Sequence, residues 1–321
     1  MNLSRRAALL GALAVPLTAR AAAPLRLGVL RFGTAAWELD VIRRHGFDAA
    51  NGIAIAASEY ASALATQVAL QAGAVDVSVQ DWLWVARQRA DGADWTYTIF
   101  STAIGALIAP PESPVRGVAD LPGKRLGIAG SPLDKSWLIL RAYTARAHGL
   151  DLDAAVTKSF GPPPLLAEQA RAGRLDAVLT YWPFAAKARA AGARVVLAMD
   201  DAVRGLGIAA EMPVAGYVFS QKWAQANTAS VTGLLAASRA AREVLATSDD
   251  EWQRLMPLTG AADAAELDQL KAYYRGGIPR AGVVDHAQAA ARLFDALAAI
   301  GGPALVGSAR VLPPGTFWQP S

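Results

Sequence analysis

The stretch DLPGKRLGIAGSPLDKSW, residues 120–137, contains the signals of one turn, strand, loop and helix. The residues Leu121 to Lys124 predict a turn, and the apolar run Arg125 to Ala129 predicts a short strand. Gly130 to Pro132 end that strand, and a helix is predicted from about Leu133. This order is typical of the first unit of an α/β lobe.

Polar residues follow the predicted strand at the place where open α/β sheets bind their ligands. Ser131, Asp134 and Lys135 are therefore candidate ligand-binding residues. The helix amino terminus also has unpaired N–H groups that can meet a polar ligand atom. Two alternatives stay open: Ser131 and Asp134 could cap their own helix, and Lys135 could be a solvated surface charge.

The segment Met1–Ala23 resembles an export signal. Two arginines precede an apolar core at 7–17, which is shorter than the ~20 residues that a membrane span needs. The start Ser4-Arg5-Arg6 resembles a twin-arginine signal, and the general secretory route stays open. We therefore expect a cleaved signal and a periplasmic product with no membrane insertion.

The composition excludes several classes of protein. Of the 31 basic residues, Arg5, Arg6 and Arg20 lie in the predicted signal, which leaves 28 against 27 acidic residues and a net charge of +1. Such a balance does not favour nucleic-acid binding. The chain has no cysteine, so neither a disulfide nor a lipid anchor on an N-terminal cysteine can form. We expect a monomer that needs no cofactor or metal.

Two halves of the mature chain follow the same plan. In the first half, strands are predicted at 24–30, 52–57 and 75–79, each followed by a loop and a helix. A shift of about one hundred residues aligns Trp37 with Trp137, Tyr60 with Phe160, Asp76 with Asp176, and Trp82 with Trp182. We therefore predict an α/β fold of two similar lobes with mainly parallel sheets, whose equivalent loops line a cleft between them.

The predicted first lobe comprises residues 24–108 plus 215–321, and the predicted second lobe comprises residues 109–214. Two crossovers marked by Pro or Gly, at 109–118 and 209–218, are expected to act as hinges. The chain after Gln221 is helical in pattern, with helices predicted at 223–245, 250–256, 264–274 and 285–300. We expect this helical tail to pack mostly on the first lobe.

Three segments resemble the substrate-binding proteins of ABC importers in the nitrate/sulfonate/taurine and thiamine-precursor group. They are residues 120–127, and the two small-Gly-x-x-Asp-hydrophobic segments at 71–77 and 171–178. The resemblance implies a type II periplasmic binding fold whose lobes are joined by two hinge crossovers. It further implies that the lobes close around a solute and then dock on a membrane permease and its ATPase.

Aromatic residues that follow the predicted strands are candidate walls of the ligand site, because aromatic rings can stack on a flat ligand or surround a cation. They are Trp37, Tyr60, Trp82, Trp137, Phe160, Tyr181 and Trp182. Thr34, Gln80 and Asp81 are further polar candidates. The tryptophans could instead be core residues between helix and sheet. Asp76 and Asp176 are expected to fix the turn into a strand.

The strand-end loops of the second half contain no arginine, although a sulfonate or nitrate pocket would profit from a fixed guanidinium. We therefore favour a small organic solute, aromatic or heterocyclic, delivered to an ABC permease. One alternative is an accessory or sensory protein that serves a non-transport partner such as an oxidoreductase.

Catalysis is a further alternative, because some relatives in the thiamine-precursor branch are pyrimidine-forming enzymes with a cysteine-rich motif and histidine chemistry. This chain lacks cysteine, and His45, His148 and His286 lie outside the predicted cleft loops. No pairing of a nucleophile with a base stands out either. We therefore do not expect an enzyme.

Overall fold

The computed structural model describes residues 23–208 and 211–319. The predicted export signal, apart from Ala23, lies outside the described residues. None of the described helices combines the length and the apolarity that a membrane span requires.

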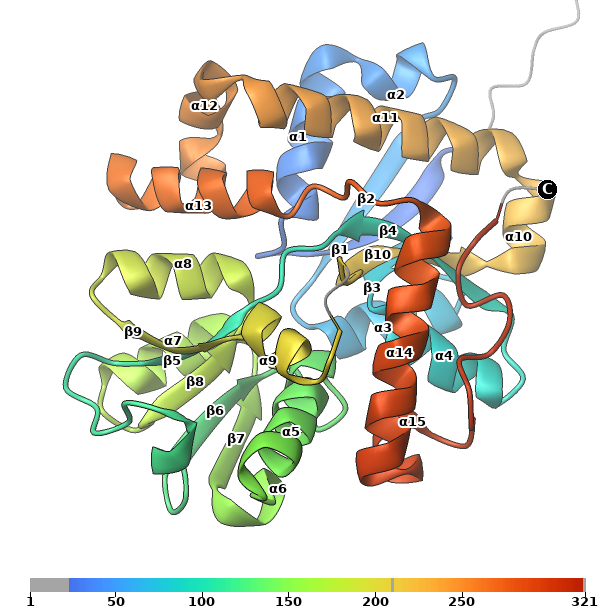
Figure 1. Ribbon diagram of the computed structural model, residues 1–321. Coiled ribbons are helices and arrows are strands. Elements are labelled where there is room, and N and C mark those ends of the chain that lie inside the picture. Colours follow the sequence, from blue (N-terminus) through green and yellow to red (C-terminus); the bar gives the residue numbers. More distant parts are fainter. Residues whose placement is uncertain (1–22, 209–210, 320–321) are drawn as a thin grey trace, which may run out of the picture.

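The first sheet has the strand order β2-β1-β3-β10-β4 (Figure 1). Its strands are β1 Leu25–Leu30, β2 Ile55–Tyr60, β3 Val77–Gln80, β4 Trp95–Ser101 and β10 Ala215–Ser220. Strand β1 pairs in parallel with β2 and β3, whereas β10 is antiparallel to both β3 and β4. Four of the strands therefore run in one direction, as the alternation of strands and helices predicts.

The second sheet repeats this arrangement with the order β7-β6-β8-β5-β9. Its strands are β5 Ala106–Ala109, β6 Arg125–Ala129, β7 Thr157–Gly161, β8 Ala177–Thr180 and β9 Arg194–Ala198. Strand β6 pairs in parallel with β7 and β8, and β5 is the antiparallel strand. The predicted α/β fold with two similar units is confirmed, and β6 has the predicted bounds.

Two equivalent ion pairs hold β1 in the first unit and β6 in the second unit. The carboxylate Oδ2 of Asp76 accepts hydrogen bonds from the backbone N and the Nε of Arg26, at 3.0 and 3.1 Å. In the second unit, Asp176 Oδ2 accepts the same two bonds from Arg125, at 2.8 and 3.0 Å. The predicted structural role of both aspartates is thereby confirmed.

The helices of the first unit are α1 Ala35–His45, α2 Phe47–Ala50, α3 Ala63–Gln71 and α4 Trp82–Ala90. Strand β2 begins three residues later than predicted, because the short helix α2 and a turn at Gly52 (φ 71°) occupy the preceding chain. Tyr60 is therefore the last residue of β2 instead of a loop residue.

The second unit contains a 3-10 turn at Val118–Asp120 and α5 Lys135–His148, α6 Leu152–Ala155, α7 Pro163–Arg171, α8 Trp182–Ala190 and α9 Met199–Gly205. As Figure 1 shows, α7 and α8 cover one face of the second sheet, and α5, α6 and α9 lie toward the other.

The chain crosses from the first sheet to the second at residues 102–105, because β4 belongs to one sheet and β5 to the other. The predicted crossover at 109–118 is wrong, and the predicted lobe boundary between Ile108 and Ala109 falls inside β5. The prolines after β5 mark a turn within the second unit, not a hinge. The return crossing connects α9 to β10 and overlaps the predicted crossover at 209–218. Ala209 and Ala210 of that crossover lie outside the described residues.

The C-terminal part is helical, with α10 Gln221–Ala226, α11 Thr228–Thr247, α12 Asp249–Thr259, α13 Ala264–Gly276, α14 Val283–Gly301 and α15 Pro303–Val306. Helix α11 packs on α1 and α2 of the first unit, as expected. However, α13 packs on α8 and α14 packs on α5, both in the second unit (Figure 1). The expectation that the tail packs mostly on the first lobe is therefore wrong for these two helices.

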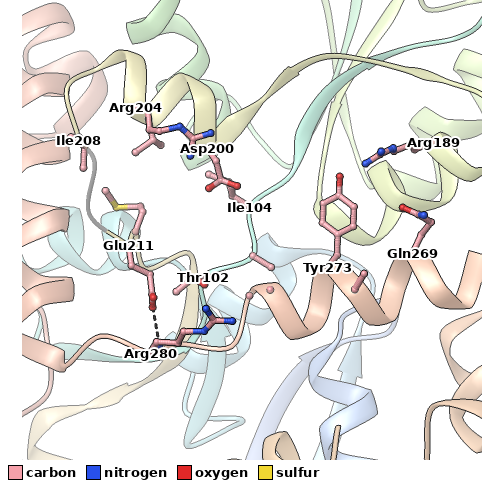
Figure 2. A pocket seen from close by; sticks show the side chains of 16 residues that line it. Thr102, Ile104, Arg189, Asp200, Arg204, Ile208, Glu211, Gln269, Tyr273 and Arg280 are labelled. Atoms are coloured by element: carbon pink, nitrogen blue, oxygen red, sulfur yellow. Dashed lines mark hydrogen bonds between the residues drawn. The ribbon is translucent and has the colours of Figure 1, made fainter. Parts of the chain in front are cut away.

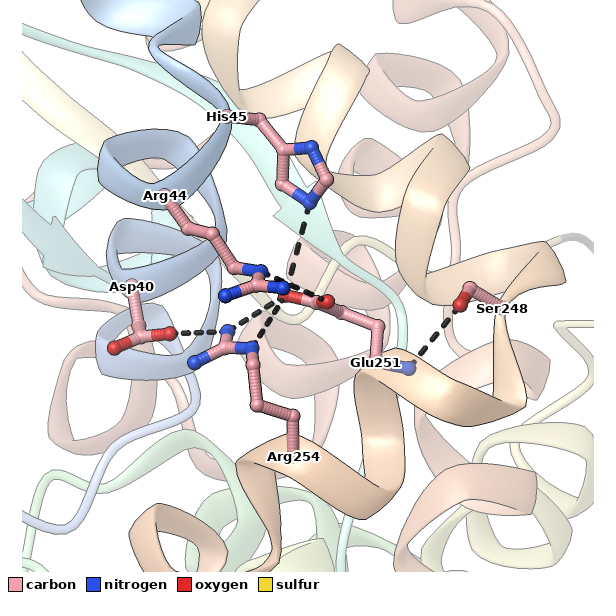
Figure 3. A network of polar contacts seen from close by, with 6 residues as sticks. All are labelled: Asp40, Arg44, His45, Ser248, Glu251 and Arg254. Carbon is pink, nitrogen blue, oxygen red and sulfur yellow. Dashed lines mark hydrogen bonds and ion pairs between the residues drawn. The ribbon is translucent and has the colours of Figure 1, made fainter.

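A charged cluster joins α12 to α1 (Figure 3). The carboxylate of Glu251, only 8% exposed, pairs with Arg254 at 2.6 Å and with Arg44 at 3.5 Å. Arg254 also pairs with Asp40 on α1. Because Arg254 contacts acidic groups on both helices, it holds α12 of the tail against α1 of the first unit.

Candidate functional site

The carboxyl ends of the strands in the two units face each other and are in direct contact. Phe32, in the loop after β1, packs against Phe184 of α8 with ring centroids 5.8 Å apart. Trp37 of α1 and Trp182 of α8 meet edge to face, also at 5.8 Å. Arg87 of α4 donates a hydrogen bond of 3.0 Å to the carbonyl oxygen of Leu133. We call this contact region the strand-end interface.

Besides Trp37 and Trp182, four of the predicted residues gather in the strand-end interface: Asp81, Asp134, Lys135 and Tyr181. Asp81 caps α4, and Asp134 caps α5 through a 2.9 Å bond from the backbone N of Ser136 to Oδ1. The second carboxylate oxygen of Asp134 accepts a 3.1 Å hydrogen bond from the Tyr181 hydroxyl. Capping thus uses only one oxygen of Asp134, and the other bonds to Tyr181, which follows β8 of the same unit.

The environment of this cluster disfavours charge. Burial, followed by the negative charge of Asp81, raises the pKa of Asp134 to about 6. Burial lowers the pKa of Lys135, which is 4% exposed, while Asp81 and Asp134 oppose that shift. The Lys135 ammonium donates to the carbonyl oxygen of Val214, next to β10. Two carboxyl groups, the Lys135 ammonium and the Arg87 guanidinium share a poorly solvated region, so a ligand that donates hydrogen bonds to the carboxyl groups would stabilise it.

The remaining polar candidates differ in whether other protein groups already occupy their hydrogen-bonding atoms. Ser131 is exposed, and its hydroxyl accepts a 3.2 Å bond from the backbone N of Leu133. Thr34 precedes α1, but its side chain makes no capping hydrogen bond. Gln80 is buried and donates to the hydroxyls of Thr66 and Ser78, at 2.6 and 3.2 Å. Thr34 and Ser131 thus remain accessible to a ligand, whereas Gln80 is occupied.

The aromatic candidates are mostly covered by protein. Trp82 is 0% exposed and Trp137 is 1% exposed, which favours the core alternative for both. The indole N–H of Trp82 donates to the carbonyl oxygen of Pro213, at 2.9 Å. Half-buried Phe160 packs on Trp137, and half-buried Tyr60 packs against the same core cluster. Ligand contact by these rings stays a prediction.

A cavity of about 640 Å³ lies at the two crossings, beside α8, α9 and α13 (Figure 2). Its polar lining residues are Thr102, Arg189, Asp200, Arg204, Glu211, Gln269, Tyr273 and Arg280. None of the site residues predicted from the sequence lines it. These residues come from separate segments with no common motif, so only the folded structure brings them together.

The duplicated sheets, the two crossings and the strand-end interface define a two-lobed protein of the periplasmic binding-protein fold. The chain belongs to the family described as NMT1/THI5 like, whose model matches residues 41–251, well over half of the chain. A search of the curated proteins found no match.

Solved structures with the same fold cover nearly the whole chain. The alkanesulfonate-binding protein SsuA from Xanthomonas axonopodis pv. citri, bound to MOPS, is 23% identical with a TM-score of 0.70, and the match covers 92% of this chain and 98% of that one. SsuA from Escherichia coli is 20% identical with a TM-score of 0.71, covering 93% and 92%. The nitrate-binding protein NrtA from Synechocystis PCC 6803 is 16% identical with a TM-score of 0.57, covering 73% and 65%. These similarities show the fold.

Proposed function

We propose that this chain is the solute-binding component of an ABC importer, and that it captures a small organic molecule between its two units and delivers it to a permease. The main observation in support is that the equivalent strand-end loops meet in one interface, where Asp134 and Lys135 are poorly solvated. The fold shared with periplasmic sulfonate-binding proteins supports this role. We further propose that the N-terminal segment directs export to the periplasm, and that the protein is not an enzyme.

We propose that the solute is aromatic or heterocyclic and carries a protonated or hydrogen-bond-donating nitrogen. Asp81 and Asp134 are opposed by Lys135 and Arg87, so the interface has no surplus cation for a sulfonate in a region of low dielectric. The rings of Phe32 and Phe184 provide flanking aromatic surface from both units. We propose Thr34, Ser131 and Oδ2 of Asp134, which would exchange its bond with Tyr181 for one with the solute, as polar contacts, and Trp37 and Trp182 as aromatic ones.

Binding is proposed to favour the closed arrangement, because the solute would contact both units only when they meet. The described residues of the two crossings, 102–105, 206–208 and 211–214, are the segments that would change conformation. The Lys135 bond to the backbone next to β10 connects the site with the return crossing.

The test compares Asp134→Asn with Asp263→Asn, a matched change at the N-cap of α13, outside the interface. Asparagine is as good an N-cap as aspartate, so neither change should unfold its helix. A library of heterocyclic amines is screened by thermal shift, and the best binder is titrated by calorimetry. We expect Asp134→Asn to weaken binding by about tenfold or more, since a charged hydrogen bond is worth about 1.5–3 kcal/mol. Equal affinity of both variants and the wild type would contradict the proposed site.

A further inference from the structure

The cavity at the crossings is distinct from the strand-end interface and belongs to both units. Arg189 comes from α8 and Arg204 from α9, both in the second unit, whereas Tyr273 comes from α13 of the tail. Thr102 and Glu211 come from the two crossings themselves. Because the lining crosses from one unit to the other, the shape of the cavity depends on the angle between the units.

Three guanidinium groups line this cavity, and two of them have no acidic partner in the described parts of the chain. Arg204 pairs with Asp201. Arg189 and Arg280 form no ion pair within residues 23–208 and 211–319, and the only hydrogen bond of Arg280 uses its backbone N. In the view of Figure 2, these two side chains lie on opposite sides of the Tyr273 ring. Both residues are exposed, so their guanidinium groups are accessible to a ligand.

The acidic groups of the cavity are fewer than its guanidinium groups and cancel only part of this charge. Glu211 Oε1 is already occupied, because it accepts a 3.0 Å bond from the Arg280 backbone N and lies 2.9 Å from Nε2 of His286. Burial raises the pKa of Asp200, whereas at Glu211 burial is outweighed by the hydrogen bonds from the Arg280 and Ala281 backbone and from His286, which lower its pKa. The lining thus places three guanidinium groups against two carboxyl groups.

The other part of the lining is apolar. Ile104, Ile208 and Met212 are buried residues of the two crossings, and the Tyr273 ring stacks on Trp182 at 6.2 Å with an interplanar angle of 9°. The volume of about 640 Å³ exceeds what an inorganic ion fills and lies in the range of small-molecule sites, about 300–1,000 Å³.

We propose that this cavity binds a small organic anion, whose carboxylate, sulfonate or phosphate group is held by Arg189 and Arg280 while its apolar part lies against Tyr273. Guanidinium groups suit such acids, because they donate paired hydrogen bonds in a planar fork. The ligand would bridge α8 and the segment after α13, so its occupancy favours the arrangement of the units in which both arginines reach it. This cavity is proposed to bind an anion, whereas the strand-end interface is proposed to bind a solute with a protonated or hydrogen-bond-donating nitrogen.

The test titrates benzenesulfonate, with benzyl alcohol as the uncharged probe of similar size, into the wild type by calorimetry and ligand-observed NMR. The variants are Arg189→Gln and Arg280→Gln, and the control is Arg239→Gln, an exposed arginine of α11 that does not line the cavity. We expect benzenesulfonate to bind the wild type and the control equally, and each cavity variant to bind at least about tenfold more weakly. Benzyl alcohol should bind all four proteins weakly and alike.

Three results would overturn the proposal. They are the absence of benzenesulfonate binding to the wild type up to millimolar concentration, unchanged affinity in both cavity variants, and an equal loss of affinity in Arg239→Gln. If Asp134→Asn changes benzenesulfonate affinity while the cavity variants do not, the anion binds at the strand-end interface and the cavity assignment is wrong. A circular dichroism spectrum and a urea titration of each variant verify that it is folded.

Discussion

Replacing Asp134 with asparagine should make the protein more stable at neutral pH. Burial, followed by the charge of Asp81, raises the pKa of this carboxyl from 3.8 to about 6. A folded-state pKa above the unfolded one means that the folded state holds the proton more tightly. The contribution of this proton to the unfolding free energy is fully present below pH 3.8 and is lost as the pH rises through about 6. Asparagine keeps the cap and the shape but cannot ionise.

The size of the effect follows from the shift. The difference between 3.8 and about 6 corresponds to an upper limit of about 3 kcal/mol at pH 7.5. The measured gain should be smaller, about 1–3 kcal/mol, because separation of the two units would return the carboxylate to water and relieve part of the penalty. At pH 4 the variant and the wild type should differ little.

The assay is urea unfolding between pH 4 and pH 8, followed by the fluorescence of the nine tryptophans. Asp263→Asn is the control, because Asp263 caps α13 through a 2.8 Å bond from the backbone N of Glu266 and is exposed. The difference in unfolding free energy between Asp134→Asn and the wild type should grow with pH, whereas that of the control should not. A pH-independent difference, or a loss of stability at pH 7.5, refutes the inferred burial of Asp134 between the units.

Three further changes test the packing. Trp82→Ala should lower the unfolding free energy by about 3–5 kcal/mol in urea titrations, because the ring is 0% exposed, and an unchanged midpoint would show that the ring is not core. Burial raises the pKa of Glu38 to about 7 from 4.5, so Glu38→Gln should abolish the fall in stability that ionisation causes between these pH values, and a persisting slope would contradict this. Gly105→Ala should destabilise by about 2 kcal/mol or more, since its Cβ would lie 1.8 Å from a backbone oxygen of β8, whereas Gly117→Ala, with nothing within 4 Å, should have little effect; equal midpoints for the two variants would contradict the close approach.

The duplicated plan could be predicted from sequence because its signals are local. The run Arg125–Ala129 lies between a turn and a glycine, and β6 has these same bounds. The pair Asp76 and Asp176 recurs at equivalent positions because each carboxylate holds the start of the neighbouring strand. Contacts of this kind, each between two neighbouring strands of one sheet, leave a visible pattern of residue types at fixed spacing.

The tryptophans show where sequence position is ambiguous. A ring at the first residue of a helix can point into a cleft or fold back onto the sheet, and both cases give the same sequence. Trp82 folds back and donates to Pro213, which lies far away in the chain. Trp182, at the equivalent position, instead meets Trp37 and Tyr273 from other elements. The neighbours that decide between the two cases are set by tertiary packing.

The crossings and the cavity beside them could not be predicted either. The first crossing has no proline, and the two prolines at 110–111 belong to a later turn within the second unit. Arg189 and Arg280 are ninety-one positions apart and line one cavity because α13 packs on α8. A site built from long-range contacts of this kind leaves no motif in the sequence.

Native mass spectrometry of the purified mature protein, compared with its mass after denaturation, tests solute binding most directly. The proposed function predicts a discrete small-molecule adduct that denaturation removes, either as purified or after incubation with the low-molecular-mass fraction of cells. The adduct should be weaker in Asp134→Asn and unchanged in Asp263→Asn. An apo mass under both conditions, for a protein shown to be folded, would contradict the proposal that this chain is a solute-binding protein.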